Sequence, residues 1–423
     1  MTRDQCIALD AQDPLARHRG SFVLPESVIY LDGNSLGALP RATPARVREV
    51  VEQQWGEGLI RSWNAAHWID LSRRVGGKIA QLIGAQPNEV ICADSTSINL
   101  FKVLSTALRM QSARPQVSLG ARRVIVSEKS NFPTDLYVAQ GLIDLLGQGH
   151  ELRLVEFDDI ATALDDRTAV LMLTHVNFRT GAMHDMHALT RRAHHAGALT
   201  IWDLSHSAGA LPVSLNSATA DFAIGCGYKY LNGGPGAPAF AFVASRHLNA
   251  IADDTFAQPL AGWLGHRAPF DFDDRYQPDP SIDRYAVGTP SIIALAALEV
   301  GVDTVLAAGV DAMRSKSIAL SDLFVRLVEL HCEGQGLRLA SPRDAQWRGS
   351  QVCFSHPQAY TIVQALIKRG VIGDFRAPDI VRFGIAPLYV RYVDVWDAVQ
   401  VLHHVLANEE WQHPECQMRA TVT

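Results

Sequence analysis

The stretch "ADFAIGCGYKYLNGGPG" (residues 220–236) joins a hydrophobic strand to a glycine-rich turn. Its first half is apolar enough for a buried strand, and its second half carries Asn, Gly and Pro, the residues typical of tight turns. Tyr228 and Lys229 lie between the two halves. Because a solvated lysine needs no such setting, we interpret Lys229 as a side chain that a rigid strand end presents to a bound molecule.

Other apolar runs predict the strands that accompany this one. Segments with helical periodicity, such as "DLYVAQGLIDLLG", separate several of them. Continuous apolar strands separated by helices predict a mainly parallel α/β sheet covered on both faces. Since ligands of such folds bind at the carboxyl ends of strands, Thr174, Asp203 and Lys229 are candidate site residues. The further strand candidates are "RRVIVSE" (122–128), "LRLVEF" (152–157), "AVLMLTHV" (169–176), "ALTIWDLS" (198–205) and "AFAFVAS" (239–245).

The pattern changes near residue 291. Residues 291–330 favour a long helical stretch broken near Gly309, and strand, helix, strand and helix patterns follow. We therefore expect three parts. Residues 1–59 form an N-terminal segment that contributes to a small domain and to the substrate site, residues 60–295 form a large cofactor-binding α/β domain, and residues 296–423 form a small α+β domain.

Composition excludes several classes of protein. The 423 residues are 48% hydrophobic and 19% charged, as in an ordered globular protein, with a formal net charge of −6. Scattered Lys and Arg argue against nucleic acid or a membrane surface as a partner. The six cysteines are far apart and the N-terminus has no apolar leader, so we expect reduced thiols and a cytoplasmic location.

Asp203 and Lys229 together suggest a specific cofactor. Taken alone, Asp203 in "WDLSHSAG" (202–209) is better explained as a structural or capping acid. The alternative for Lys229 is a surface lysine near a loop. Together they supply what pyridoxal 5'-phosphate requires: a lysine for a covalent link and an acid that keeps the ring nitrogen protonated. We therefore expect this cofactor.

Two helix starts offer further cofactor contacts. Ser95, Thr96 and Ser97 precede an amphipathic segment, where backbone N–H groups favour an anion such as a phosphate, although an ordinary N-cap has the same sequence. Phe132 precedes Pro133 and is either a ring that stacks on the pyridine or part of a hydrophobic staple. The local sequence leaves both alternatives open.

Motifs along most of the chain resemble the kynureninases, a family in the class V aminotransferase-like group of fold-type I pyridoxal phosphate enzymes. "LDGNSLG" and "YKYLNGGPG" discriminate best, and the motifs occur in family order. The resemblance implies a large domain with a mainly parallel, seven-stranded type of sheet. The matching pieces are "YLDGNSLGALP" (30–40), "GLIRSWN" (58–64), "SNFPTD" (130–135), "NFRTG" (177–181), "WDLSHSAGALPV" (202–213), "GCGYKYLNGGPG" (225–236), "GWLGH" (262–266), "GTPSI" (288–292) and "VRFGIAPLY" (381–389).

The resemblance also implies residue roles. Lys229 would be the Schiff-base lysine, with Asp203 and His206 on the ring-nitrogen side of the cofactor. Trp263 and Thr289 would reach the phosphate from a neighbouring subunit, so that a homodimer shares its active sites. The remaining cofactor contacts would be Thr96, Ser97, Phe132, Asp135, Thr174 and Tyr228.

On the substrate side, the resemblance assigns the α-carboxylate to Arg382, whose planar guanidinium suits a carboxylate. An ion pair at a strand edge is the simpler explanation of an isolated arginine in "IVRFGIA". Asn34 and Ser35 are expected to line the substrate site. The aryl ring would meet a bacterial-type pocket, which favours L-kynurenine over 3-hydroxykynurenine. Its residues would be Trp63, Gly288 and Thr289.

The implied reaction is hydrolysis of L-kynurenine to anthranilate and L-alanine by Cβ–Cγ cleavage. Tyr228 is the candidate proton donor to Cβ, because a phenol titrating near ~10 is protonated at neutral pH. The implied role is in tryptophan catabolism through the kynurenine pathway. Whether the product serves degradation or biosynthesis, including that of NAD, is left open.

Other functions are compatible with parts of the sequence. On the same fold, a cysteine desulfurase or selenocysteine lyase needs an activated, accessible thiol, but Cys353 lies in an apolar strand and Cys332 has no loop motif. A class V aminotransferase is a further alternative. We expect no metal, because the histidines at 184, 187, 194 and 195 lack a ligand motif and are better explained as exposed helix residues. A scaffold without the cofactor would be expected to lack Lys229 or Asp203.

Overall fold

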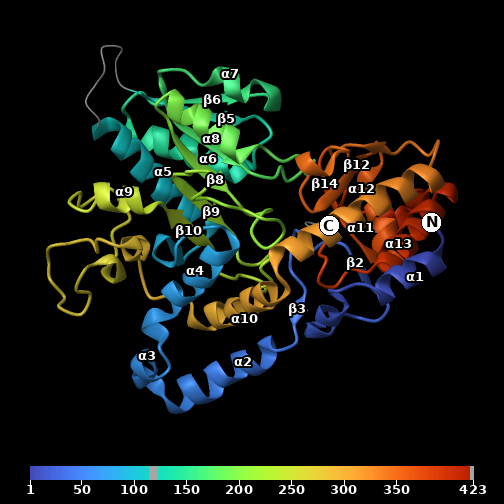
Figure 1. Cartoon of the computed structure of the whole chain (residues 1–423), viewed down its shortest axis with the longest axis horizontal. Coiled ribbons are helices and arrows are strands. Elements are labelled where there is room, and N and C mark those ends of the chain that lie inside the picture. Colours follow the sequence, from blue (N-terminus) through green and yellow to red (C-terminus); the bar gives the residue numbers. More distant parts are fainter. Residues whose placement is uncertain (114–121, 420–423) are drawn as a thin grey trace.

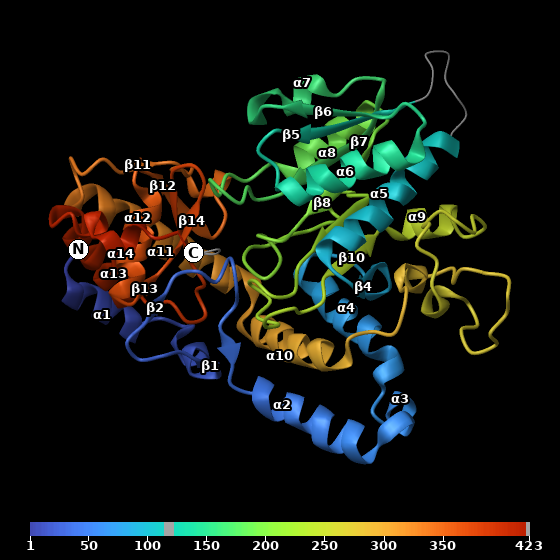
Figure 2. The ribbon, with the colours of Figure 1, turned by 180° about the vertical axis from the view of Figure 1, so that it is seen from behind.

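The computed structural model describes residues 1–113 and 122–419 and divides into two lobes. The larger lobe is built around a sheet of seven strands, and the smaller lobe contains both the N-terminal helix and the end of the chain (Figure 1). Seen from behind, helices α2 (Thr43–Glu49) and α3 (Ser62–Ala65) form an arm below the larger lobe (Figure 2). The π-helical segment Val50–Glu57 continues α2 along this arm.

The sheet of the larger lobe has the strand order β4-β10-β9-β8-β7-β5-β6. Neighbours from β9 to β6 pair in parallel, and β10 runs antiparallel to both β9 and β4. The prediction of a mainly parallel sheet is therefore confirmed, although the sequence reasoning missed the three-residue strand β4. The strands are β4 (Val90–Cys92), β5 (Val124–Glu128), β6 (Glu151–Val155), β7 (Thr168–Thr174), β8 (Leu199–Asp203), β9 (Phe222–Gly225) and β10 (Phe240–Val243).

Helices cover both faces of this sheet, because successive strand side chains point to opposite sides. Ile201 belongs to the hydrophobic cluster under α5 (Thr96–Ala113) and α6 (Pro133–Leu146). Trp202 belongs to the cluster that α4, α8 and α10 cover. These and the shorter helices of the lobe are α4 (Leu71–Leu82), α7 (Ile160–Ala163), α8 (Met186–His195), α9 (Ser245–Ala250) and α10 (Ile292–Ala308).

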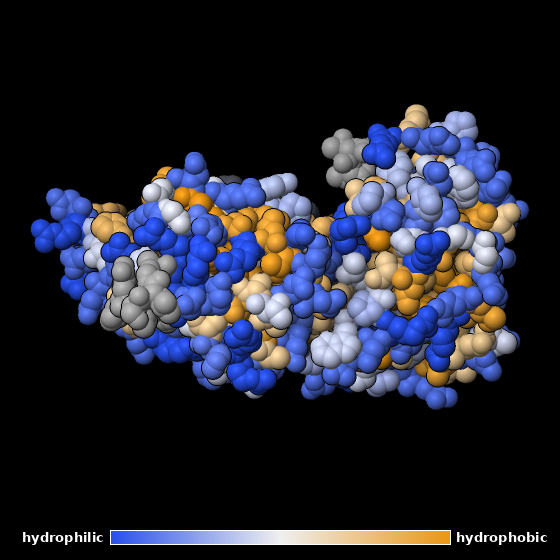
Figure 3. Space-filling model, turned by 90° about the horizontal axis from the view of Figure 1, so that it is seen from above, coloured by the Kyte–Doolittle hydropathy of each residue, from blue (hydrophilic) through white to orange (hydrophobic). Residues whose placement is uncertain are grey.

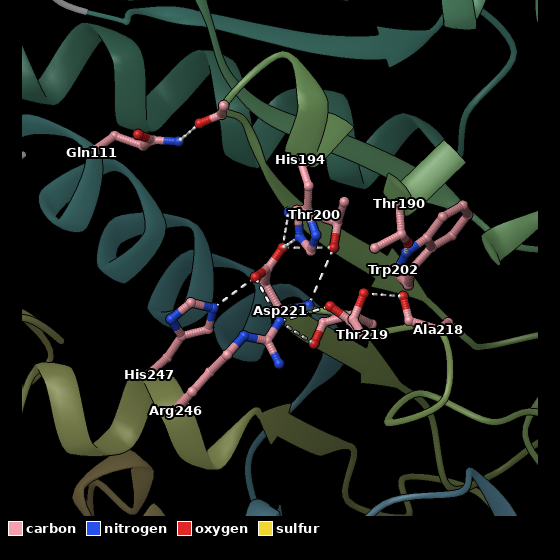
Figure 4. A network of polar contacts seen from close by, with 12 residues as sticks. Gln111, Thr190, His194, Thr200, Trp202, Ala218, Thr219, Asp221, Arg246 and His247 are labelled. Atoms are coloured by element: carbon pink, nitrogen blue, oxygen red, sulfur yellow. Dashed lines mark hydrogen bonds and ion pairs between the residues drawn. The ribbon is translucent and has the colours of Figure 1, made fainter. Parts of the chain in front are cut away.

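A buried polar network fixes the start of β9, the strand that leads to Lys229 (Figure 4). The Asp221 carboxylate accepts hydrogen bonds from the Thr200 backbone N–H at 2.8 Å and from Arg246 at 2.8 Å. It also contacts His194 at 2.7 Å and His247 at 2.6 Å. Burial opposes ionisation, but the two histidines outweigh it and lower the pKa of Asp221. One carboxylate thereby ties α8 and α9 to two central strands.

The smaller lobe contains a four-stranded antiparallel sheet with the order β11-β12-β15-β14. Strand β2 (Ile29–Tyr30) pairs with β13 (Val371–Ile372), so the N-terminal segment joins this lobe, and short strands β1 (Phe22–Val23) and β3 (Leu39–Pro40) pair with each other. The other elements are β11 (Arg338–Leu339), β12 (Gln351–Ser355), β14 (Asp374–Arg376), β15 (Ile380–Gly384), α1 (Arg3–Ala11), α11 (Val310–His331), α12 (Ala359–Lys368), α13 (Tyr392–Ala407) and α14 (Pro414–Gln417).

The predicted break near Gly309 is confirmed, because α10 ends and α11 begins there with a bend of 81°. Helix α10 packs on α4, where Arg74 Nε donates to Glu299 at 2.8 Å. The division at residues 59 and 295 remains a proposal, and the α10–α4 contact favours Gly309 as the end of the larger lobe. Within the described part of the chain, no single helix has the length and apolar composition of a membrane span, and α10 and α11 meet that test only as a bent pair.

Backbone hydrogen bonds join the two lobes along a short seam. The seam pairs residues 181–183 of the larger lobe with residues 347–349 of the smaller lobe. Met183 N donates to Trp347 O at 2.9 Å, and Gly349 N donates to Gly181 O at 2.8 Å. These bonds hold the carboxyl ends of the large sheet beside β12 of the small one.

The face drawn in Figure 3 is largely hydrophilic, with apolar patches on both lobes. Several large apolar side chains of the arm are exposed: 58% of Trp55 and 77% of Ile60 are accessible. A second, mostly apolar cavity of about 610 Å³ lies between this arm and α10. The arm is therefore one of the apolar parts of the described chain that the rest of the protein leaves uncovered.

Candidate active site

A cavity of about 770 Å³ lies at the carboxyl ends of the parallel strands, where the sequence predicted a site. The amino ends of α5 and α6, the turn after β9 and the segment before α10 form its walls. It brings together most of the predicted cofactor residues. The predicted residues that line it are Thr96, Ser97, Phe132, Asp135, Thr174, Asp203, His206, Tyr228, Lys229, Gly288 and Thr289.

Lys229 is presented by a turn rather than by the strand itself. Strand β9 ends at Gly225, and Lys229 lies in the turn that follows. The turn closes when Gly233 N donates to Gly227 O at 2.9 Å, and Gly234 has a φ of +84°, which favours glycine. The structure thus corrects the expectation that Lys229 lies at the end of a strand. The glycines that follow it let the chain fold back beneath the lysine.

The N-terminal segment packs directly against this turn. Gly37 N donates to Tyr228 O at 2.8 Å. A Cβ at Gly37 would lie 2.4 Å from the carbonyl oxygen of Lys229, closer than any side chain can approach. A glycine is therefore required at the second glycine position of "LDGNSLG", because only a residue without a Cβ lets the N-terminal segment pack against the lysine turn.

Two buried carboxylates face the cavity beside the lysine. Asp203 Oδ1 accepts hydrogen bonds from Ser205 N at 2.8 Å and from Ser205 Oγ at 2.6 Å. The Thr174 hydroxyl interacts with both Asp203 and Asp135 and also donates to Asn131. Burial raises the pKa of both acids, and the charge of Asp203 raises that of Asp135 further. The two buried acids therefore favour a cationic group bound beside them in the cavity.

His206 contacts the lysine itself. Its Nε2 lies 3.2 Å from Lys229 Nζ. Burial, followed by the charge of Lys229, lowers the pKa of His206, so the ring is neutral. The sequence reasoning grouped His206 with Asp203 on one side of the cofactor, whereas the structure brings its ring to the lysine amine.

The two helix starts are arranged for ligand contact. Ser95 Oγ accepts from Ile98 N at 3.4 Å and serves as the cap of α5, which leaves Thr96 and Ser97 on the cavity wall. Phe132 precedes α6 and also lines the cavity, with Lys229 Nζ 5.9 Å from its ring centroid. Of the two alternatives for Phe132, its position favours a ring that faces a ligand.

Arg382 lies outside the cavity wall in a separate polar cluster. Its Nε donates to Asp374 Oδ1 at 2.7 Å, and its Nη2 donates to Ser35 Oγ at 2.8 Å. The oxygen of the Asn34 amide lies 2.9 Å from Nε when that amide is oriented to accept. The structure thus brings together the predicted substrate residues Asn34, Ser35 and Arg382, but it gives the bidentate face of Arg382 to Asp374.

Two further predicted residues, on the arm and on a loop, also lie apart from the cavity. Trp63 sits on the arm, with its ring 6.2 Å from that of Trp68 in an edge-on arrangement. Trp263 packs edge-on against Phe270 at 5.7 Å and is 38% exposed. Neither lines the cavity of its own chain, so their predicted roles remain proposals.

Sequence reasoning missed several residues that organise the site. Gln351 Nε2 donates to the carbonyl oxygens of Asn177 and Phe178, and Arg382 Nη1 donates to the second of these at 2.5 Å. Asp374 faces Arg382 because β14 and β15 pair with these two residues in register. The sequence signal that could have found Asp374 is the short connection of three residues between the two strands. Such a connection predicts a hairpin, in which Asp374 lies opposite Arg382.

The cysteines and histidines bear on the alternative functions. All six cysteines are buried and free, and burial raises the pKa of Cys353 to about 12. Cys332, for which exposure was considered, is buried as well. Two histidines expected on an exposed helix are engaged instead: His184 contacts Glu128 at 2.9 Å, and His194 contacts Asp221. Among the described residues, no group of three His, Cys, Asp or Glu side chains is placed to hold a metal ion.

Comparison with known proteins identifies the family. A family model described as the kynureninase C-terminal domain matches residues 313–402. The chain is 56% identical to a protein named kynureninase from Burkholderia mallei (strain SAVP1) and 54% identical to one from Pseudomonas fluorescens, each over the full length of both chains. The chain belongs to the kynureninase family. The kynureninase resemblance drawn from the motifs is thereby confirmed.

Solved structures with low sequence identity share the kynureninase fold seen here. A cysteine desulfurase from Thermococcus onnurineus NA1 matches with a TM-score of 0.74 at 19% identity, covering 93% of this chain and 98% of its own. A C-DES variant with glycine covalently linked to its PLP cofactor matches with a TM-score of 0.74 at 16% identity, covering 92% and 99%. The expected fold class is confirmed.

Proposed function

We propose that this protein is a pyridoxal phosphate-dependent enzyme that hydrolyses L-kynurenine to anthranilate and L-alanine. Membership of the kynureninase family supports the substrate. The observation that carries the chemistry is the contact of Lys229 Nζ with His206 at 3.2 Å, in a cavity that also holds Asp203. A lysine amine for the covalent link and a buried acid for the ring nitrogen are the groups that this cofactor requires.

The donor set fits pyridoxal phosphate. Burial raises the pKa values of Asp203 and Asp135, and the charge of Asp203 raises that of Asp135 further, so a protonated ring nitrogen would relieve an excess of buried negative charge. At the other end of the cavity, the amino end of an 18-residue helix presents backbone N–H groups and the hydroxyls of Thr96 and Ser97 to a phosphate. Both ends of the cofactor thus have partners of complementary charge.

We assign the holding of the cofactor to the predicted residues. Lys229 would carry it, Asp203 would hold the ring-nitrogen proton, and Phe132 would cover one ring face. When bound, the cofactor supplies an electron sink conjugated to the substrate α-carbon. The further contacts that we assign are Thr96, Ser97, Asp135, Thr174, His206 and Tyr228, with Trp263 and Thr289 from the partner subunit.

The chain's own residues would then move the protons. Lys229 Nζ would take the proton from the substrate Cα, and its neutral neighbour His206 can accept a hydrogen bond from the resulting ammonium. Tyr228 would donate a proton to Cβ when the Cβ–Cγ bond breaks. Burial is the main cause that raises the pKa of Tyr228, so its phenol keeps its proton at neutral pH and is available as a donor.

We assign the α-carboxylate of the substrate to the cluster of Arg382, Asn34 and Ser35. Asp374 occupies the bidentate face of Arg382, and Nη1 already donates one hydrogen bond to the Phe178 carbonyl oxygen. The carboxylate would therefore use the second N–H of Nη1 together with the neighbouring polar groups. The aryl ring would lie toward Gly288, Thr289 and Trp63, and we propose L-kynurenine as the preferred substrate over 3-hydroxykynurenine.

We further propose a homodimer in the cytoplasm that acts in tryptophan catabolism. The exposed apolar arm and the cavity of about 610 Å³ beside it support an interface there. Trp63 lies on this arm, and Trp263 is exposed on another loop, so both are available to a second subunit. The buried free cysteines suit a reducing compartment. We include NAD biosynthesis in this proposal as one use of the reaction product.

The test follows anthranilate fluorescence after L-kynurenine is added to the protein loaded with pyridoxal phosphate. We expect turnover by the wild type, with one alanine formed per anthranilate. Tyr228→Phe is expected to slow the reaction by roughly 10²-fold, the effect of removing a general acid.

Two outcomes would contradict the assignments. A protein that binds the cofactor but releases no anthranilate would refute the substrate, and sulfide release from cysteine would then point to the desulfurase alternative. Turnover by Tyr228→Phe at the wild-type rate would remove Tyr228 from the role of proton donor.

A further inference from the structure

One buried cation behind the cavity wall has no part in the reaction proposed above. Lys102 lies in the second turn of α5, and its side chain is wholly buried. Because an isolated buried charge is costly, a lysine in such a place requires acceptors. Its Nζ donates to Asp94 Oδ2 at 2.7 Å and to the carbonyl oxygen of Tyr285 at 2.6 Å. Lys102 therefore connects two segments that are far apart in the sequence.

The first partner, Asp94, belongs to the cavity wall. It lies between β4 and α5, directly before the capping residue Ser95, and 31% of its side chain is exposed. Its φ of +50° lies in a region that few residues other than glycine adopt, and its carbonyl oxygen accepts from Ala239 N at 2.9 Å. The fold therefore places a carboxylate on the same wall as the hydroxyls of Thr96 and Ser97, where we propose that a phosphate binds.

The second partner, Tyr285, leads into another part of the wall. Residues 286–290, between Tyr285 and α10, line the cavity. Tyr285 is wholly buried, and its hydroxyl donates to Thr106 Oγ at 3.0 Å. The Thr106 hydroxyl in turn donates to the carbonyl oxygen of Lys102 at 3.0 Å. Helix α5 thus holds this part of the wall through both the main chain and the side chain of Tyr285.

We propose that Lys102 is a positioning residue for the cofactor phosphate, because it neutralises Asp94 and fixes the wall at which the phosphate binds. This inference rests on the proposed function, which places the phosphate at the start of α5. With Lys102 present, the pair of Lys102 and Asp94 carries no net charge. Without Lys102, the Asp94 carboxylate would repel a phosphate group that carries a charge of about −1.5 to −2 at neutral pH.

A purely structural ion pair would give a different pattern of effects. If the pair only stabilised the fold, removal of either partner would weaken the binding of charged and uncharged ligands alike. If Lys102 acts on a phosphate, the two partners have opposite effects on its binding. Removal of the cation leaves a negative wall, whereas removal of the acid leaves a positive one. The signs of the two effects therefore separate the two roles.

The experiment titrates the cofactor-free full chain with pyridoxal 5'-phosphate and, in parallel, with pyridoxal, which lacks the phosphate. Absorbance of the bound compound gives the Kd for each. Lys102→Met is expected to raise the Kd for pyridoxal phosphate roughly tenfold and to leave the Kd for pyridoxal within about twofold. Asp94→Asn is expected to lower the Kd for pyridoxal phosphate. The double variant, Lys102→Met with Asp94→Asn, is expected to recover most of the wild-type affinity, because it restores a neutral wall.

An equal loss of affinity for pyridoxal phosphate and pyridoxal in Lys102→Met would overturn the inference, as would weaker binding of pyridoxal phosphate by Asp94→Asn. The second variant keeps Lys102 and its contact with Tyr285, so it tests the inference even if Lys102→Met does not fold. A wild type that binds pyridoxal phosphate but does not cleave L-kynurenine would refute the proposed substrate, and the Kd values would still decide the role of Lys102. A wild type that binds no pyridoxal phosphate would refute both.

Discussion

The cavity around Lys229 and the cluster around Arg382 hold their charges in opposite ways. Beside Lys229, burial raises the pKa values of Asp203 and Asp135, and the Thr174 hydroxyl is shared between them. Beside Arg382, the pKa of Asp374 is lowered, because the hydrogen bond and charge of Arg382 outweigh burial. The Lys229 cavity holds two buried acids and one lysine, so one acid has no cationic partner of its own. In the Arg382 cluster, the acid Asp374 forms an ion pair with Arg382.

This difference indicates that a bound ligand balances the buried charges in the Lys229 cavity, whereas the protein's own side chains balance them in the Arg382 cluster. Buried charges are costly unless they are paired. The Lys229 cavity is suited to a cationic ring that completes its charge balance, whereas the Arg382 cluster keeps its geometry through its own ion pairs. Substitutions should therefore affect chemistry in the first region, and both stability and substrate affinity in the second.

The largest effect is expected from Lys229→Ala. The variant lacks the amine that we assign to take the proton from the substrate Cα, so kcat should fall by at least about 10³-fold. Anthranilate fluorescence measures the rate, and absorbance reports whether the cofactor is retained. The matched control is Lys129→Ala, an exposed lysine paired with Glu156. A comparable loss in both variants would show that the effect does not depend on the position of Lys229.

The next effect tests the buried acids. Asp203→Asn keeps the hydrogen-bonding shape but removes the charge that would hold the ring-nitrogen proton, and we expect kcat to fall by roughly 10²–10³-fold. The bound cofactor should also change its absorbance spectrum. Exposed Asp158→Asn is the control. A normal kcat in Asp203→Asn would contradict the distinction between the two regions.

Arg382→Lys tests the paired region. Lysine cannot make the bidentate contact with Asp374, so the variant should raise KM for L-kynurenine and lower the free energy of unfolding by about 3 kcal/mol. Urea unfolding and steady-state kinetics measure the two effects. Exposed Arg343→Lys serves as control. An unchanged free energy of unfolding would mean that the cluster does not stabilise itself.

The smallest catalytic effect is expected far from both regions, at Asp221. Asp221→Asn removes the charge that His194, His247 and Arg246 share, and we expect a loss of stability on the order of 3 kcal/mol at pH 7 with little change in kcat. Because the pKa of Asp221 is lowered in the folded state, its contribution is present above about pH 4 and is lost as the pH falls below that value. Urea unfolding at pH 7 and pH 3, with exposed Asp253→Asn as control, measures the difference. A difference in stability that stays equal at both pH values would contradict this account.

The sequence predicted the elements of the larger lobe well because its strands are buried on both faces. Such strands are continuous apolar runs, and the six predicted runs correspond to β5 through β10. Strand β4 was missed because three residues give too short a pattern. Glycine and proline also marked the breaks correctly, at Gly309 and after Lys229.

From residue chemistry alone, the site could be predicted only where the chemistry dictates residue type, and the family resemblance supplied the other residues. Asp203 and Lys229 could be singled out because few other residues supply a buried acid and a reactive amine. Asp374 and Gln351 could not, since their importance arises from strand register and from the contact between lobes.

The seam between residues 181–183 and 347–349 has a consequence for how the protein can diverge. Main-chain hydrogen bonds do not depend on side-chain identity, so Ala182, Met183 and Trp347 can be exchanged without breaking the bonds that align the lobes. Sequence drift at those positions is therefore buffered, and the placement of Lys229 relative to Arg382 does not depend on the identity of these three side chains.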